Sequence, residues 1–213
     1  MSSYTIPSVI ESTGRGERVS DIYSRLLSDR IVFVGTPIDD GVANVVIAQL
    51  LHLSAAAPER DIELYVNSPG GALTSVLAIH DTMRHVAPDI ATLCVGQAAG
   101  AAALLVACGT AGKRSILHHA RVMLHQPASE VRRGSMSELA VEAAEVARVR
   151  RDVEDVLAAH TGHSSDTIRA DIEHGLILTA AEAVDYGVAD MIAGGSASSG
   201  EQFDPSRALR PDS

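Results

Sequence analysis

Two glycine-rich segments are the parts of this sequence best suited to acyl-transfer chemistry. The segment VGQAAG (residues 95–100) follows an apolar run and leads into an Ala/Leu-rich stretch, which predicts a sharp turn from a strand into a helix. Hydrolases often place a nucleophile on such a turn, but here the turn residue is Gly100, which has neither a hydroxyl nor a thiol. The segment NSPGG (67–71) forms a similar turn. Two such turns present backbone N–H groups that suit an oxyanion or a phosphate, or they are simply tight connections.

His125 is a candidate general base, because it lies at the end of the segment RVMLHQ (121–126), which predicts a strand. A single histidine at a strand end is more often structural than catalytic, so its role stays open on the residues alone. His118 and His119 are adjacent and cannot both face one metal ion from a strand, and no cysteine or carboxylate lies at ligand spacing. We therefore expect no metal site and no cofactor.

None of the other side chains stands out as a nucleophile. Cys94 lies in the apolar run before the turn, where a thiol usually packs as a small hydrophobic group. Cys108 falls at the far end of the helix predicted after the turn. Thr74 and Ser75 follow NSPGG without a base beside them. The four side chains lack the neighbours that would activate them.

The composition narrows the classes of function. The 17 Lys+Arg against 27 Asp+Glu give a formal charge of −10, which disfavours nucleic acids and anionic membranes as partners. Two cysteines fit a reducing compartment, and the first residues lack the basic and apolar regions of a signal peptide. The most apolar run, residues 98–108, is about half as long as the ~20 residues of a membrane helix. We expect a soluble, cytoplasmic protein.

The elements that would position these residues alternate between strands and helices. Short β-branched or apolar runs predict strands at residues 31–35, 62–66, 90–95 and 121–126. Helical spacing and capping signals predict helices after Asp39 or Asp40, at 72–86, 100–108 and 136–160, and after Thr179. This order predicts an α/β domain (21–193) with repeated strand–helix turns, after a polar, flexible arm (1–20) and before a disordered tail (194–213).

Seven short motifs give this sequence a family resemblance. In order they are DIYSRLL, NSPGG, GQAAG, GKR, RVMLHQP, HTG and TAAEAVDYG. Their order and spacing resemble ClpP, the proteolytic subunit of the ATP-dependent Clp protease, over roughly residues 6 to 192. The resemblance implies the α/β ClpP/crotonase-like fold with a long protruding handle helix, an N-terminal arm that forms an axial loop, and assembly into heptameric rings.

The resemblance assigns a catalytic role to each of three positions. In the family the turn reads GQAAS and its serine is the nucleophile, and this position is Gly100 here. The base is the histidine of HQP, which is His125. The aspartate that orients this base corresponds to Gly175, four residues before Thr179. Two of the three triad positions are therefore glycine.

Other catalytic features are kept or only weakly replaced. Gly71 and the amide of Ala101 match the oxyanion-hole positions of the family. Asp171 lies one helical turn before Gly175 and aligns with a different acidic residue, so it is a weak substitute for the aspartate. Loss of its nucleophile lowers the kcat of a serine protease by about 10⁶-fold, because a base without a nucleophile forms no acyl-enzyme. The resemblance predicts a chain without ordinary peptidase activity of its own.

The positions that dock an AAA+ unfoldase in the family are also altered. This sequence keeps Tyr65 but has Glu63 and His85 at other aromatic positions of the apolar docking pocket. A carboxylate in such a pocket disfavours docking. The small, Gly-containing strand that pairs with substrate is replaced by the charged segment ASEVRRG (128–134), and His174 replaces an arginine of the ring contact. We expect weak unfoldase docking or none.

Three hypotheses of function follow. The main one is a non-catalytic ClpP paralogue that forms homomeric or mixed heptameric rings, stacked with an active ClpP, as a structural or regulatory subunit. The second is a serine-type peptidase with residual activity or an unrecognised nucleophile. The third is a crotonase-like acyl-CoA enzyme, whose oxyanion hole needs only two backbone N–H groups.

Overall fold

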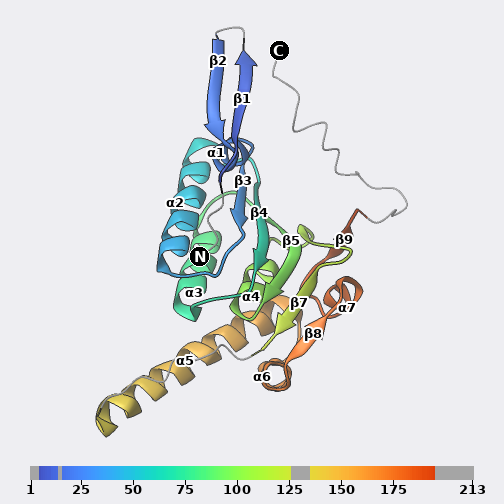
Figure 1. Cartoon of the computed structure of the whole chain (residues 1–213). Coiled ribbons are helices and arrows are strands. Elements are labelled where there is room, and N and C mark those ends of the chain that lie inside the picture. The colour runs from blue at the N-terminus through green and yellow to red at the C-terminus, as the bar shows by residue number, and fades with distance from the viewer. Residues whose placement is uncertain (1–4, 14–15, 126–134, 195–213) are drawn as a thin grey trace.

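Strands alternate with helices along most of the chain, as the sequence predicts (Figure 1). The computed structural model describes residues 5–13, 16–125 and 135–194. The strands are β1 (Ser8–Thr13), β2 (Gly16–Asp21), β3 (Ile31–Val34), β4 (Ile62–Ser68), β5 (Ile90–Ala99), β6 (Arg114–Leu117), β7 (Arg121–Leu124), β8 (Leu176–Leu178) and β9 (Met191–Ala193). The helices are α1 (Ile22–Ser28), α2 (Asp40–Ala56), α3 (Leu73–His85), α4 (Ala101–Ala107), α5 (Met136–Thr161), α6 (Ser165–His174) and α7 (Ala180–Asp185).

One mixed sheet organises the fold. Strands β3, β4, β5, β6 and β9 lie side by side in that order and run parallel. Strand β5 has two partners on one edge, since Thr92 pairs with Arg114 of β6, whereas Ala98 pairs with Val122 of β7. Strand β8 runs antiparallel to β7. The second half of β5 and the end of β7 therefore lie next to each other, which positions the turn at Gly100 beside His125.

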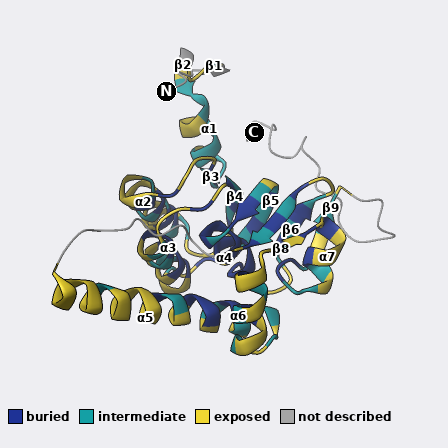
Figure 2. Ribbon diagram, turned by 60° about the horizontal axis from the view of Figure 1, so that its bottom comes forward, coloured by how far each residue is buried: buried dark blue, intermediate teal, exposed yellow. Residues whose placement is uncertain are grey.

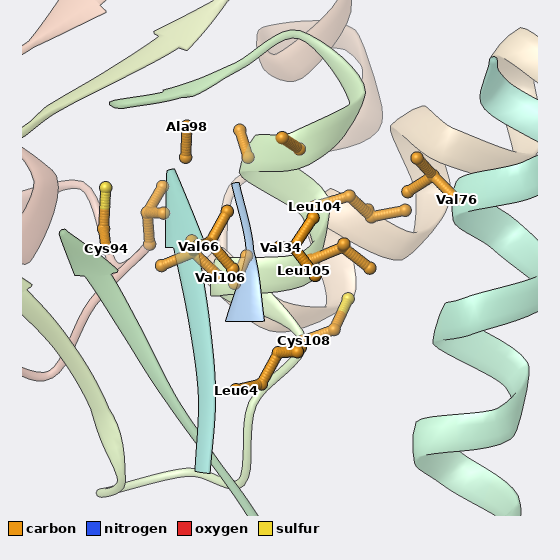
Figure 3. Close-up of a cluster of buried hydrophobic side chains, with 14 of the residues drawn as sticks. Val34, Leu64, Val66, Val76, Cys94, Ala98, Leu104, Leu105, Val106 and Cys108 are labelled. Carbon is orange, nitrogen blue, oxygen red and sulfur yellow. The ribbon is translucent and has the colours of Figure 1, made fainter. Parts of the chain in front are cut away.

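Helices cover one face of this sheet and form the core with it (Figure 2). Alternate residues of β4 are buried, among them Leu64 and Val66, and all seven residues of α4 are buried as well. Figure 3 shows Leu104 and Leu105 of α4 in the same cluster as Leu64 and Val66. Each aliphatic side chain of this size stabilises the fold by about 1.5–3 kcal/mol when buried. The helix that follows the turn is thus held rigidly from all sides.

Helix α5 has 26 residues, and its N-terminal half extends beyond the rest of the fold (Figure 1). It begins in a capping box, in which Ser135 and Glu138 satisfy each other's backbone N–H groups. Its C-terminal half packs into the core through Val149, Val153 and Leu157. Apolar residues continue along the N-terminal half of this helix, but there Leu139 and Val146 are exposed. None of the described helices, α5 included, has the length and hydropathy that a membrane span requires.

A buried carboxylate fastens α5 to α6. Glu154 is 1% exposed, and its two oxygens accept from Nε of Arg150 (2.8 Å) and Nε of Arg169 (2.9 Å). Arg150 also donates to Glu173 in α6 at 3.0 Å. Arg150 and Arg169 together compensate the negative charge of Glu154, which would otherwise be costly to bury.

The N-terminal arm contains an antiparallel hairpin. Strand β1 pairs with β2 from Ser8 opposite Asp21 to Thr13 opposite Gly16. The hairpin projects from the end of the fold that carries α1 (Figure 1). Its backbone ladder orders a segment whose polar composition predicts flexibility. The predicted domain start at residue 21 falls on the last residue of β2, and the predicted tail lies outside the described residues except for Gly194.

Several predicted element boundaries are wrong by one to a few residues, and those next to the elbow matter most. The strand expected over 90–95 continues to Ala99, because its second half pairs with β7 and with Ser68 of β4. Helix α4 therefore begins at Ala101, one residue after Gly100. Strand β7 ends at Leu124, so His125 lies just beyond a strand that was expected to continue to residue 126.

Candidate active site

Gly100 occupies the sharp turn between β5 and α4. Its backbone has φ 52° and ψ −121°, a conformation that residues with a side chain rarely adopt. Its N–H donates to the carbonyl oxygen of Met123 in β7 (2.8 Å), and its own carbonyl accepts from the N–H of Ala103 (3.1 Å). These bonds hold the turn without a side chain at position 100. The strand–turn–helix geometry of a nucleophile elbow is present.

The imidazole of His125 lies next to Gly100. A Cβ atom placed on Gly100 would be 3.3 Å from Cε1 and 3.4 Å from Nε2 of His125. A hydroxyl one bond farther out would be within hydrogen-bonding reach of the ring. His125 is exposed, and among the described residues no group hydrogen-bonds to its imidazole. The fold thus brings the predicted base to the predicted nucleophile position, where no nucleophile is present.

Gly175 lies opposite His125 across the pair of β7 and β8. The register pairs Leu124 with Leu176, so His125 and Gly175 are the next residues beyond that pair. Gly175 ends α6 with a left-handed backbone (φ 77°, ψ 70°), and a Cβ there would meet no described atom within 4 Å. Aspartate tolerates this backbone region better than most residues. The position therefore has room for the missing carboxylate.

Asp171, the acidic residue one helical turn before Gly175, has a different partner. Its Oδ2 accepts a hydrogen bond of 2.6 Å from the hydroxyl of Tyr186 at the end of α7. Its backbone carbonyl accepts from the N–H of Gly175 at 3.0 Å, which closes the last turn of α6. Burial, followed by the hydrogen bond and the negative charge of Asp171, raises the pKa of Tyr186. Asp171 therefore anchors α7 to α6 instead of pairing with His125.

We expect Asp171→Asn to lower the pKa of Tyr186 toward the ordinary phenol value of about 10. Because the pKa is raised in the folded state, the bound proton stabilises the fold fully below pH ~10, and this stabilisation is lost as the pH rises through the folded pKa. Alkaline difference absorbance of the phenolate, with Tyr186→Phe as reference, measures the pKa. Asp166→Asn is the control, since that carboxylate is 90% exposed and bonds Arg169. Identical titrations of Asp171→Asn and the natural chain would contradict the contact.

The amides of Gly71 and Ala101 border the elbow. Ala101 is the first residue of α4, so its N–H has no acceptor within the helix. Gly71 forms an isolated β-bridge with Ile38. The N–H of Ile38 donates to the carbonyl of Gly70, and the N–H of Ala72 donates to the carbonyl of Ile38, so this bridge does not use the N–H of Gly71. A Cβ on Gly70 would lie 3.6 Å from the nitrogen of Ala101, so the two turns are adjacent. A Cβ on Gly71 would overlap the carbonyl oxygen of Ile38, so this position requires glycine.

A small cavity lies beside the elbow. Its volume of about 20 Å³ has room for about one water molecule. Residues of the elbow, β7 and three helices line it: Leu73, Gly100, Ala101, Leu124, His125, Arg150, Val153, Leu157 and Ile172. The elbow, His125 and the buried half of α5 therefore line the same cavity, so the packing of α5 affects the geometry of the site.

The other candidate nucleophiles are not activated. Burial raises the pKa of the Cys94 thiol and of the Cys108 thiol to about 12, so both stay protonated at neutral pH. Ser75 is buried, and its hydroxyl donates to Oδ1 of Asp40 at 2.6 Å, which joins α3 to the start of α2. Thr74 is exposed on the first turn of α3. Serine and threonine become nucleophiles through an adjacent base, and a carboxylate alone is too weak a base to ionise Ser75.

A second candidate surface lies on the half-exposed face of β4, which carries Glu63 and Tyr65. Burial, followed by a hydrogen bond to Glu63 and its negative charge, raises the pKa of Tyr65. His85 is exposed at the end of α3, and no described contact joins it to either residue. Phe33 pairs with Tyr65 in the strand register, and the ring centroid of Tyr23 lies 6.3 Å from that of Phe33. Sequence reasoning missed both rings, although Phe33 occupies an alternating position in its strand as Tyr65 does.

The mixed sheet, the sharp turn at Gly100 and the two glycine turns define an α/β protein with a strand–turn–helix elbow next to His125. The sequence matches the Clp protease family over residues 14–196. It is 57% identical to the ATP-dependent Clp protease proteolytic subunit 2 of Streptomyces avermitilis over 192 residues, which cover 90% of this chain and 96% of the relative. It is 56% identical to the proteolytic subunit 4 of Rhodococcus jostii, with coverage of 90% and 98%. The chain belongs to the Clp protease family, which confirms the resemblance and the α/β fold.

Proposed function

We propose that this chain is a non-catalytic subunit of a Clp protease that assembles with a ClpP chain carrying a complete triad. The observation that carries the proposal is Gly100 at the elbow, within contact distance of His125. The base and both amide turns are retained, whereas the positions for the nucleophile and for the orienting carboxylate, Gly100 and Gly175, have no side chain. The site has kept its framework and lost the groups that react.

The chemistry of acyl transfer supports the proposal. His125 can accept a proton, but Gly100 has none to give, so no acyl-enzyme forms at this elbow. Removing such a nucleophile lowers kcat by about 10⁶-fold, and the remaining assistance comes from the oxyanion hole and substrate binding. A peptidase with another nucleophile is less well supported, because Cys94 and Cys108 are buried and protonated. A crotonase-like acyl-CoA enzyme has only the two glycine turns in its favour.

The exposed part of α5 supports assembly through this helix. Met136 is 84% exposed, Val141 71% and Val146 48%. Single exposed aliphatic residues are common, but several on one helix that extends away from the fold form apolar surface that favours contact with another subunit. We assign this half of α5 the role of the handle through which two heptameric rings, of this chain or mixed, contact each other.

We expect Val141→Glu to shift the assembled protein toward smaller species, because burying a carboxylate against apolar surface costs several kcal/mol. Native mass spectrometry measures the distribution of species. Arg148→Gln is the matched control, since it removes an exposed pair with Glu145 on the same helix, and such pairs contribute only about 0–1 kcal/mol. An unchanged distribution for Val141→Glu would contradict the handle role.

The face around Tyr65 supports only weak docking of an AAA+ unfoldase. An apolar docking loop would have to desolvate the carboxylate of Glu63, which already interacts with the Tyr65 hydroxyl. An active partner ring would then supply the docking sites of a mixed assembly.

Co-expression with a catalytically complete ClpP tests the assembly. We expect the two chains to co-purify and to appear together in one complex by native mass spectrometry. Strictly separate complexes would contradict the mixed assembly, while a peptidase assay on the isolated chain tests the lost activity independently.

A further inference from the structure

Three side chains that can bind a metal ion meet where α3, α4 and α5 come together. They are His80 of α3, Cys108 at the end of α4 and His160 near the end of α5. A ring nitrogen of each histidine and the sulfur of Cys108 all lie within 4.8 Å of one another. In the part of the chain that the structure describes, no other such group was found. We propose that His80, Cys108 and His160 form a zinc site, which the sequence pattern does not predict.

The ligand set suits zinc. Two imidazoles and a thiolate are ligands that Zn²⁺ prefers, and a fourth position remains for water. The Cys108 thiol is protonated in the metal-free chain and releases its proton to solvent when zinc binds. Zn–N bonds of about 2.0–2.1 Å and a Zn–S bond of about 2.3 Å separate tetrahedral ligand atoms by roughly 3.5 Å. The widest pair of donor atoms, now within 4.8 Å, must therefore close by about 1 Å. Small side-chain rotations achieve this without moving the helices.

A carboxylate supports the first histidine. Nδ1 of His80 lies 3.0 Å from Oδ1 of Asp81, so the ring donates its Nδ1–H to this carboxylate and leaves Nε2 with a free lone pair. Histidines that bind zinc usually donate their other ring N–H to a carboxylate in this way. The charge of Asp81 also partly offsets that of a bound cation.

The backbone around the other two ligands is held by one buried arginine. Nη1 of Arg114 donates to the carbonyl of Ala107 (3.2 Å), which precedes Cys108, and to the carbonyl of His160 (3.0 Å). The positive charge of Arg114 is paired with Asp190 at 2.5 Å, so it does not act unopposed on a nearby cation. Two ligands from different helices are thus held in position before any metal binds, which metal sites require.

The three side chains are buried or half-buried, so an ion bound between them would be shielded from solvent. His80 is 9% exposed and Cys108 5% exposed. The rings of His80 and His160 meet edge to face with centroids 6.1 Å apart. Cys94, the other buried thiol, reaches the carbonyl of Arg121 at 3.8 Å, whereas among the described residues the Cys108 thiol has no hydrogen bond of its own. A zinc ion bound by all three groups would connect α5 to the helix that follows the elbow.

Metal titration of the tag-free, full-length chain after removal of metal with a chelator tests the site. We expect one equivalent of Zn²⁺ per chain, and we expect Co²⁺ to give the charge-transfer absorption of a thiolate ligand. Cys108→Ser and His80→Gln should each weaken zinc binding at least about 10-fold. Cys94→Ser and His119→Ala, which change the same residue types elsewhere, should bind zinc as the natural chain does.

Three results would overturn the site: no stoichiometric zinc binding by the natural chain, a Co²⁺ spectrum without the thiolate band, or equal zinc affinities of Cys108→Ser and Cys94→Ser. The first two measurements use the natural chain, so they do not depend on whether a variant folds. They are also independent of peptidase activity and of assembly.

Discussion

The double variant Gly100→Ser/Gly175→Asp is expected to hydrolyse a fluorogenic peptide that the natural chain leaves intact. A serine at the elbow would place its hydroxyl within reach of the His125 ring, since the Cβ would lie 3.4 Å from Nε2. An aspartate at position 175 would lie opposite His125 in the extended β7–β8 register. The new nucleophile restores the step whose loss lowers kcat by about 10⁶-fold.

The single variants should rank below the double variant. Gly100→Ser alone lacks the carboxylate that holds the imidazole in the correct tautomer, and this loss lowers kcat by about 10⁴-fold. Gly175→Asp alone lacks a nucleophile and should stay inactive. Serine in the backbone conformation of Gly100 is also strained by about 1–3 kcal/mol, which a lower Tm would report.

His125→Ala in the double variant is the control and should abolish turnover. Hydrolysis of the peptide by the natural chain in a way that depends on His125 would contradict the loss of the nucleophile. A double variant that folds and assembles like the natural chain but remains inactive would contradict it as well.

The second large effect is expected for Arg114→Met. Arg114 is 8% exposed, and its guanidinium bonds the carboxylate of Asp190 (2.5 and 3.0 Å) and the carbonyls of Ala107, His160 and Gly187. Its removal leaves a poorly solvated carboxylate and carbonyl groups without a donor. Breaking such a buried pair from one side lowers stability by about 3–5 kcal/mol. Urea unfolding followed by circular dichroism measures this loss.

Arg148→Met is the matched control for this variant. Arg148 has a side chain that is 63% exposed and pairs only on the surface with Glu145 at 2.6 Å. An exposed pair contributes about 0–1 kcal/mol, so the control should unfold close to the natural chain. If both variants lost the same stability, Arg114 would not be the anchor that joins the end of α4 to α5.

Local patterns predicted four of the described strands and five of the described helices, but they missed β1, β2, β6, β8, β9, α1 and α6. The turns at Gly100 and Gly71 are predictable because glycines stand between an apolar strand and a helix. The whole pattern extends over only a few residues of the sequence. The extension of β5 to Ala99 is different, because the segment VGQAA becomes a strand through its pairing with β7, which follows later in the chain. Pairing between segments that are far apart in the sequence leaves no periodic pattern of apolar residues in either segment.

The candidate active site and the proposed zinc site also differ in how far local sequence patterns predict them. The position of His125 follows from a motif, but its contact with Gly100 depends on β7 lying beside the end of β5. His80, Cys108 and His160 are far apart in the sequence and show no metal-binding spacing, so the expectation of no metal site followed from local spacing alone. Only the packing of α3, α4 and α5 brings them together.

Gly100 leaves this chain without a nucleophile at the elbow. Reaction with a fluorophosphonate, followed by intact-mass measurement of the chain and of a co-assembled ClpP with a complete triad, tests this loss most directly. We expect the adduct on the complete ClpP and none on this chain, because Gly100 has no hydroxyl and no other described nucleophile is activated. A stoichiometric adduct on this chain that disappears in His125→Ala would contradict the account.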